Sequence, residues 1–247
     1  MSLHRTGPSL LETIARTLFT HDAAGRLVHV NEPDGPRAPR LYVSWSGRDL
    51  LWRVRDDVPR ALVDDIAAIL AGHPVPGDLG RLPGFTVEVC AALARNAPVT
   101  DDLVGDVEYT FPGDVGDVGA AEGAREAAAD AVVAVTPENA DVLVRWLPAW
   151  RSYASSGLPN LAVVVDGAAV AVCASVRFPG EATEAGVETH AAFRGRGHAA
   201  TATAAWARAV RARGMLPLYG TSWRNVASQR VAAKLGLVRV AASLGIA

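Results

Sequence analysis

The chain has 247 residues, a formal net charge of −2, and apolar side chains at 50% of its positions. This length accommodates one large domain or two small ones, and the apolar fraction is sufficient for a packed core. The small net charge argues against a general nucleic-acid-binding protein. No apolar run reaches the roughly 18 residues of a membrane span.

The cysteines and histidines predict neither a disulfide framework nor a metal site. Cys90 and Cys173 are isolated in the sequence, and the six histidines are scattered without a second ligand at metal spacing. The N-terminus lacks the apolar core of a signal peptide, so we expect a cytoplasmic protein. Lys234 is the only lysine among 24 basic residues, a bias typical of a GC-rich bacterial genome.

The N-terminal part of the chain has the pattern of a mixed α+β region. Alternating apolar residues predict a hairpin over Leu18–Val30 and a second one that pairs Leu41–Trp45 with Leu50–Val54. The other expected elements are helices over Pro59–Ala71 and Phe85–Arg95 and a strand over Val107–Phe111. We find no motif here that indicates a function.

The composition changes over Pro112–Asp130, which is rich in Gly, Ala, Asp and Glu and nearly free of large apolar residues. This segment is either a linker, with a short helix over Ala120–Ala129, or a surface excursion of one compact fold. We therefore divide the chain into an N-terminal region (1–112), a linker or excursion (113–130) and a C-terminal domain (131–247).

Strands and helices are expected throughout the C-terminal domain. Thr136-Pro137-Glu138 is typical of a helix start, because Thr caps helices, Pro suits the first position and Glu favours the positive end of the helix dipole. The remaining expected elements are a strand over 132–135, a hairpin of 161–165 with 169–175, strands over 186–191, 216–221 and 238–242, and helices over 199–213 and 225–235.

The most informative segment is Arg194-Gly195-Arg196-Gly197-His198-Ala199, which lies between an expected strand and an alanine-rich helix. Glycines let a backbone come close to a ligand, and the free N–H groups and dipole of a helix N-terminus favour an anion. The segment therefore predicts a site for a pyrophosphate.

The R-x-x-G-x-A spacing of Arg194, Gly197 and Ala199 resembles the acyl-CoA loop of the GNAT superfamily of N-acetyltransferases. A second block, N-x-x-S…K-L-G-L over residues 225–237, resembles another motif of the same superfamily and follows at the expected distance. The resemblance covers the C-terminal half. It implies an α/β (α+β) fold with a mixed, mostly antiparallel, splayed sheet flanked by helices, and acetyl-CoA as cosubstrate without a metal.

Members of the superfamily usually have one further strand after the one expected at Val238–Ala242. An unpaired strand edge is a liability in a soluble protein. We therefore expect the N-terminal region, or a second subunit of a homodimer, to cover this edge.

The resemblance assigns cofactor-binding residues to three segments. The backbone of Val187, Glu188 and Thr189 would pair with the pantetheine arm like an added strand, where the neighbouring strands splay apart. Asn225 and Ser228 match positions that line the far side of the cofactor, although Asn225 equally suits the N-cap of its own helix. The pyrophosphate loop would contribute Arg194, Gly195, Arg196, Gly197, His198, Ala199 and Ala200.

The usual proton-transfer residues of the superfamily are absent. Many members have a tyrosine at the position of Ala232 and a carboxylate on the preceding strand, but Leu216–Ser222 holds no acid. Glu184, Glu188 and His190 are candidate bases, because alternation places them on one face of a strand and a partly desolvated carboxylate can accept a proton from an ammonium group. The two glutamates equally suit a solvated position or an arginine partner, and His190 equally suits a packing role.

Tyr219 is a candidate for protonating the leaving thiolate, with Ser222 and Cys173 as alternates. Trp223, in the turn before the last helix, is a candidate wall of the acceptor pocket.

Together these features predict an N-acetyltransferase that moves an acetyl group from acetyl-CoA to a primary amine by direct attack in a ternary complex. The acceptor is a small-molecule amine or a protein amino group, and we expect no nucleic-acid or membrane partner. The alternative is a catalytically silent acyl-CoA-binding or regulatory module, which the missing tyrosine and strand carboxylate leave open.

Overall fold

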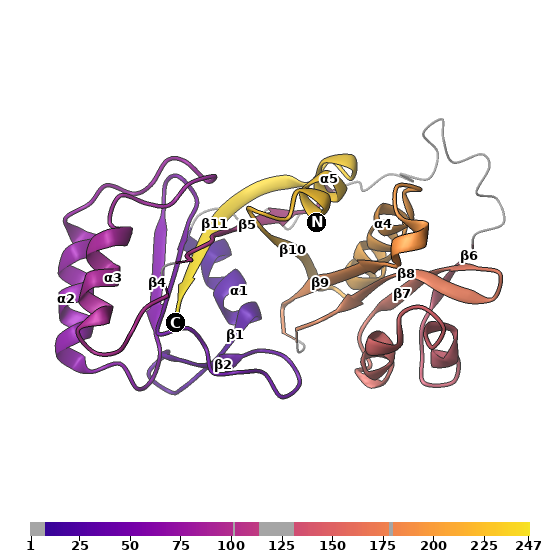
Figure 1. The fold of residues 1–247 in the computed structure, drawn as a ribbon, viewed down its shortest axis with the longest axis horizontal. Helices are drawn as coiled ribbons and strands as arrows, with labels where there is room; N and C mark the ends of the chain where they lie inside the picture. The colour runs from indigo at the N-terminus through magenta and orange to yellow at the C-terminus, as the bar shows by residue number, and fades with distance from the viewer. Residues whose placement is uncertain (1–7, 101, 114–130, 178–179) are drawn as a thin grey trace.

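One continuous sheet runs through both halves of an elongated molecule (Figure 1). The computed structural model describes residues 8–100, 102–113, 131–177 and 180–247. The helix expected over Ala120–Ala129 and most of the expected linker lie outside these residues. In the described part of the chain, no helix has the length and apolar character needed to cross a membrane.

The N-terminal region contains the two expected hairpins and both expected helices, with ends that differ by one or two residues. It also contains a helix that we did not expect, although Leu10, Leu11 and Ile14 have the spacing of a buried helix face. The elements are α1 (Pro8–Leu18), β1 (Phe19–His21), β2 (Leu27–Val30), β3 (Leu41–Trp45), β4 (Leu50–Val54), α2 (Arg60–Ala71), α3 (Thr86–Ala94) and β5 (Asp106–Thr110).

The C-terminal region follows the expected order from strand to strand. Its elements are β6 (Ala131–Ala134), η1 (Ala140–Leu143), η2 (Pro148–Ser155), β7 (Asn160–Val165), β8 (Ala168–Ser175), β9 (Ala182–Thr189), η3 (Ala191–Phe193), α4 (His198–Ala212), β10 (Leu216–Ser222), α5 (Val226–Lys234) and β11 (Val238–Ile246), where η marks a 3₁₀ helix.

The helix expected from Thr136 is replaced by a turn and the two 3₁₀ helices η1 and η2. Asn139 Oδ1 accepts a hydrogen bond from the Thr136 N–H at 2.8 Å, which closes the turn. Pro148 then begins η2, and a proline disfavours helical backbone in the residue before it. A continuous α-helix therefore cannot pass through this segment.

Strand β5 completes the sheet of the C-terminal region. It lies antiparallel between β10 and β11, where Glu108 pairs with Gly220 and Val107 with Ala242. The expectation that the N-terminal region covers this edge is confirmed. Because β11 also pairs with β3, the strand order of the nine-stranded sheet is β4-β3-β11-β5-β10-β9-β8-β7-β6, and β1 pairs with β2 in a separate hairpin.

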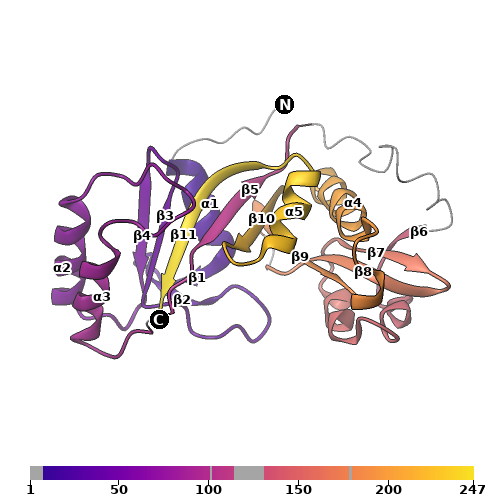
Figure 2. The same cartoon turned by 45° about the horizontal axis from the view of Figure 1, so that its top comes forward.

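Helices α2 to α5 cover one face of this sheet, which we call the helix face. Val43 and Trp45 pack under α2 and α3, and Val107 and Tyr219 pack under α4 and α5. The other face carries α1 and the β1–β2 hairpin toward one end and η1 and η2 toward the other, and we call it the hairpin face. Figures 1 and 2 show β9 and β10 in the middle of the molecule, with α1 and the β1–β2 hairpin toward one end and η1 and η2 toward the other.

Candidate active site

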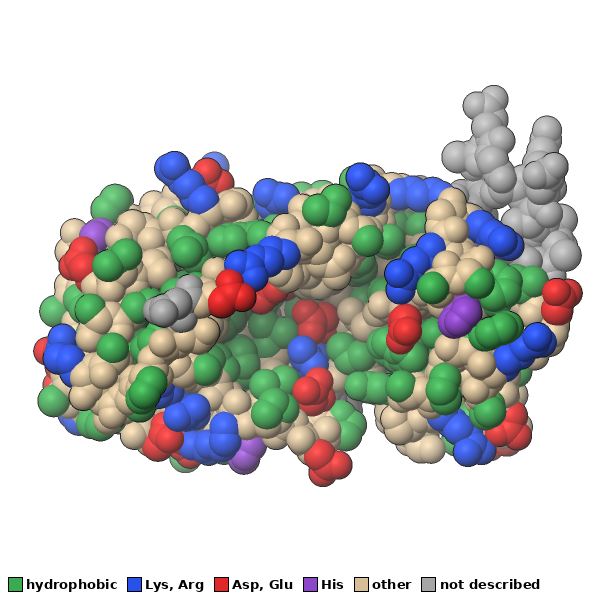
Figure 3. Space-filling model, in the orientation of Figure 1, with side chains coloured by type: hydrophobic (Ala, Val, Ile, Leu, Met, Phe, Trp, Pro, Cys, Tyr) green, Lys and Arg blue, Asp and Glu red, His purple; other side chains and the backbone are tan. Residues whose placement is uncertain are grey.

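A cleft with a volume of about 1120 Å³ opens where β9 and β10 separate. These parallel strands pair only over Ala182–Glu184 and Leu216–Leu218 and then diverge, which confirms the splayed sheet implied by the sequence. Residues of both chain regions line the cleft. Figure 3 shows the molecule hollowed at its centre, with acidic side chains in the hollow.

Helix α4 begins at this cleft. Gly195 and Gly197 before it have φ angles of +80° and +89°, in the left-handed region that favours glycine. No side chain in the described part of the chain caps the helix at Gly197, so its first N–H groups remain available to a ligand. A Cβ atom at Gly197 would lie 2.9 Å from Lys234 Nζ. This cradle fits a polyanion held by backbone amides.

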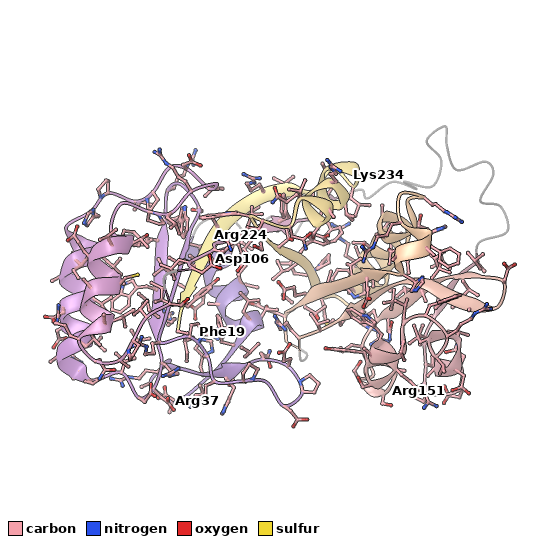
Figure 4. All side chains as sticks on the ribbon, in the orientation of Figure 1. Phe19, Arg37, Asp106, Arg151, Arg224 and Lys234 are labelled. Atoms are coloured by element: carbon pink, nitrogen blue, oxygen red, sulfur yellow. The ribbon has the colours of Figure 1, made fainter. Side chains whose placement is uncertain are left out.

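Basic side chains gather beside the α4 N-terminus. The Arg194 Nε donates to the Thr189 carbonyl oxygen at 3.2 Å, which ties the loop to β9. Arg230 and Lys234 line the cleft from α5, and Figure 4 labels Lys234 on that helix. Sequence reasoning missed these two residues, because helical spacing alone does not show which side of α5 faces the loop.

The cleft brings together all of the expected cofactor-binding residues except one. Arg196 lies outside the lining, and its guanidinium stacks over the Phe193 ring at 5.3 Å. Asn225 lines the cleft and also caps α5, since its Oδ1 accepts a hydrogen bond from the Ser228 N–H at 3.1 Å. The residues that line the cleft are Val187, Glu188, Thr189, Arg194, Gly195, Gly197, His198, Ala199, Ala200, Asn225 and Ser228.

Three carboxylates meet in the cleft on the hairpin face. Asp106 and Glu108 come from β5, and Glu184 comes from β9 on the other side of β10. Gly220 of β10 makes room for them, because a Cβ there would collide with Glu184 Oε1 and would lie 2.9 Å from Glu108 Oε2. Figure 4 shows Asp106 in the middle of the molecule. Only 3% of Glu108 and 8% of Glu184 is exposed, so both carboxylates are buried.

One arginine compensates part of this charge. The Arg177 guanidinium contacts Glu184 Oε2 at 3.1 Å and Glu32 Oε2, in the loop after β2, at 2.7 Å. Glu108 Oε1 accepts a hydrogen bond from the Ser243 hydroxyl at 3.1 Å. Arg177 therefore orients Glu184, and Ser243 orients Glu108.

Burial controls the protonation of this cluster. It raises the pKa of Glu108 well above the ordinary value, and the charges of Glu184 and Asp106 raise it further. Burial also raises the pKa of Glu184, while Arg177 opposes the shift. Adjacent carboxylates of this kind can hold a proton between them at a pH where an exposed glutamate has none. Among the described residues, no group of three or more His, Cys, Asp or Glu is placed to hold a metal ion.

Sequence reasoning missed Asp106 and Glu108, because only strand pairing over more than 100 residues brings β5 beside β10. A local signal existed, since the two acids alternate with the buried Val107 and Tyr109 on one strand.

The other expected bases have different surroundings. Glu188 lines the cleft but is exposed, and its Oε2 accepts a hydrogen bond from Trp150 Nε1. His190 lies outside the lining, with its ring 4.5 Å from that of Trp146. Trp223, the expected pocket wall, also lies outside the lining and packs in the core under α2 and α3. These surroundings favour a packing role for His190 and Trp223.

Tyr219 places a hydroxyl on the α5 side of the cleft. It is 2.7 Å from Ser228 Oγ, and burial raises the pKa of Tyr219 to about 12. Ala232, where many superfamily members have a tyrosine, is fully buried against α4 and leaves no room for one. Cys173 is also fully buried and lies outside the lining, whereas Ser222 lies within it.

Residues 135–242 match the protein family described as GNAT acetyltransferase. The matched segment contains the α4 loop, the diverging strands and α5. The C-terminal region of the chain belongs to the GNAT superfamily. The carboxylates of β5 reach the cleft from outside the matched segment.

A solved structure of a GNAT protein shares this fold. A tandem GNAT protein from the clavulanic acid biosynthesis pathway, solved without AcCoA, matches 87% of this chain and 79% of its own with a TM-score of 0.51 and 15% identity. A putative GNAT-family acetyltransferase from Novosphingobium aromaticivorans is 22% identical with a TM-score of 0.45. The match covers 60% of this chain and 65% of the Novosphingobium chain, so this chain spans less than two thirds of the length of that protein. No curated protein matches the chain in sequence.

Proposed function

We propose that this GNAT protein is an N-acetyltransferase that transfers an acetyl group from acetyl-CoA to a primary amine by direct attack in a ternary complex. The observation that carries the proposal is a single cleft with an uncapped helix N-terminus on one side and buried carboxylates on the other. Superfamily membership supports the same activity.

The residues present fit acetyl-CoA. The N–H groups of residues 195–200 would hold its diphosphate, with added positive charge from Arg194, Arg230 and Lys234. Beyond Glu184, the edge of β9 that faces β10 is unpaired, so its backbone can bind the pantetheine arm as a strand would.

Acetyl transfer forms a C–N bond and breaks a C–S bond. The ammonium nitrogen loses one proton before it attacks and a second one as the tetrahedral intermediate collapses, and the thiolate takes up one proton, so that one proton is released to solvent. We assign the first proton to Glu184, with Glu108 beside it, because both are buried in the cleft and a raised pKa makes a carboxylate a stronger base. Tyr219 supplies the proton of the thiolate through a hydroxyl on the α5 side of the cleft, and the second proton that leaves the nitrogen restores the hydroxyl.

Release of the CoA thiol in the presence of primary amines tests the proposal directly. The wild-type protein should release thiol from acetyl-CoA only when an amine is added, and Gly197→Glu should abolish the release. Gly25→Ala is the matched control, because Gly25 also has a positive φ, +76°, but lies in the β1–β2 turn outside the cleft. CoA binding without thiol release for any amine would favour the silent acyl-CoA-binding module instead.

A further inference from the structure

Charges are segregated within the cleft. Basic side chains lie beside the α4 loop and on α5, and acidic side chains lie on the hairpin face, with Arg177 as the one cation among them in the described part of the chain. The basic set is Arg194, Arg230 and Lys234, and the acidic set is Glu32, Asp106, Glu108, Glu184 and the exposed Glu188. A cleft of this kind complements two partners of opposite charge, one polyanionic and one cationic.

The acidic side holds more negative charge than its own residues compensate. Arg177 bridges Glu32 and Glu184, but the half-buried carboxylate of Asp106 has no hydrogen-bond or ion-pair partner among the described residues. Burial raises the pKa of Asp106, so its charge is costly in the free protein. A bound cation would remove that cost.

An unpartnered hydroxyl lies in the same part of the cleft. Tyr42 is 2% exposed and lines the cleft, and its hydroxyl makes no hydrogen bond of ordinary geometry with the described residues, although Ser44 and Ser243 lie near it. Buried hydroxyls are almost always well hydrogen-bonded, so this group is available to a polar ligand. Leu18, Phe19 and Val30 line the cleft beside it and offer an apolar surface for methylene groups.

We propose that the acceptor is an alkyl amine with a second positive charge, such as a short diamine, whose distal ammonium is held by Asp106 and Tyr42 on the hairpin face. This inference rests on the proposed N-acetyltransferase activity. The reacting nitrogen must be neutral when it attacks, so it cannot balance the carboxylates at that moment. A second ammonium group stays charged throughout and compensates the carboxylate that Arg177 leaves unpaired.

Matched amines of equal length test the substrate class by thiol release. The comparison is between 1,4-diaminobutane, butylamine and 4-aminobutyrate, which share one alkyl stem and differ in the distal group. We expect kcat/KM for the diamine to exceed that for the monoamine by roughly tenfold, as befits one charge-assisted contact, and 4-aminobutyrate to be the poorest. Equal values for the diamine and the monoamine would overturn the inference.

Two conservative variants locate the second charge. Asp106→Asn should bring the diamine-to-monoamine ratio close to one and should raise thermal stability, since it removes a desolvated charge. Tyr42→Phe keeps the ring, which packs 5.0 Å from Phe19, and should raise KM for the diamine without changing KM for acetyl-CoA. Asp141→Asn is the control, because Asp141 is 85% exposed on η1 and pairs with Arg151. A diamine preference that survives Asp106→Asn contradicts the assignment.

Calorimetry separates this inference from the activity on which it rests. If the protein binds CoA but none of the added amines causes thiol release, the proposed function fails. Titration with 1,4-diaminobutane alone then still tests whether the diamine site exists. Heat from the diamine that butylamine does not give, and that Asp106→Asn abolishes, supports a dication site. If titration with 1,4-diaminobutane gives no such heat, the proposed dication site is wrong.

Discussion

The two regions of the chain contribute to the cleft in different ways. The C-terminal region supplies an anion site made of backbone N–H groups at the start of α4, within a run of six residues. The N-terminal region supplies side chains, Asp106 and Glu108, on a strand inserted between two strands of the other region. A site built from local backbone leaves a clear signature in the sequence, whereas a site assembled across a sheet leaves only a weak one.

The largest expected effect comes from a substitution in the backbone site. Gly197→Glu places a side chain at a φ of +89° and a negative charge where the diphosphate would bind. CoA affinity should fall by roughly a hundredfold or more, about 2.8 kcal/mol, when measured by calorimetry. Gly25→Ala should bind CoA as the wild type does. Undiminished binding by Gly197→Glu would remove the α4 loop from the site.

Tyr219→Phe tests the proton donor on the α5 side. The ring and its edge contact with Tyr109, at 6.2 Å, remain, so the fold should be preserved. Loss of the hydroxyl should lower kcat by roughly tenfold, at the small end of general acid–base effects, with CoA affinity unchanged. An unaltered kcat would show that water or another group, and not Tyr219, protonates the leaving thiolate.

The buried carboxylates should make stability depend on pH. Because the folded pKa of Glu108 is raised above the ordinary 4.5, its contribution to stability is complete below about pH 4.5 and is lost as the pH rises through the folded value. The substitution Glu108→Gln removes the ionisable group, so the variant does not lose this stability as the pH rises. Each unit of pKa shift corresponds to about 1.4 kcal/mol, or roughly 3–6 °C in Tm for a chain of this size.

Thermal unfolding at several pH values measures this effect. The Tm of Glu108→Gln should match that of the wild type near pH 4.5 and exceed it increasingly toward pH 8. A difference that stays constant across this range would show that Glu108 is not buried in an unfavourable charged state.

Glu188→Gln should have the smallest effect. Glu188 was a candidate base from its position on β9, but its carboxylate is exposed and bound to Trp150. We expect kcat to fall no more than about twofold, since a solvent-exposed carboxylate already hydrogen-bonded to a tryptophan is a poor candidate for the base. A loss comparable to that of Glu184→Gln would return the catalytic role to Glu188.

The sequence was sufficient to predict most of the strands and helices and the α4 loop, because alternation, helix ends and glycine-rich turns are local patterns. It could not predict the place of β5, which depends on pairing Glu108 with Gly220 far along the chain. For the same reason the sequence showed Gly220 only as part of a strand, whereas the structure shows that it makes room for two carboxylates. The local start signal at Thr136 did not show that a turn closed by Asn139 and two short 3₁₀ helices replace the expected helix.

The central claim is that both regions build one active site, and the rate of CoA thiol release by Glu108→Gln at saturating acetyl-CoA and amine tests it most directly. We expect kcat near neutral pH to fall by roughly tenfold or more, with KM for acetyl-CoA unchanged, because the carboxylate of β5 takes part in removing the proton from the amine. A variant that turns over at the wild-type rate would contradict the claim and confine the chemistry to the C-terminal region.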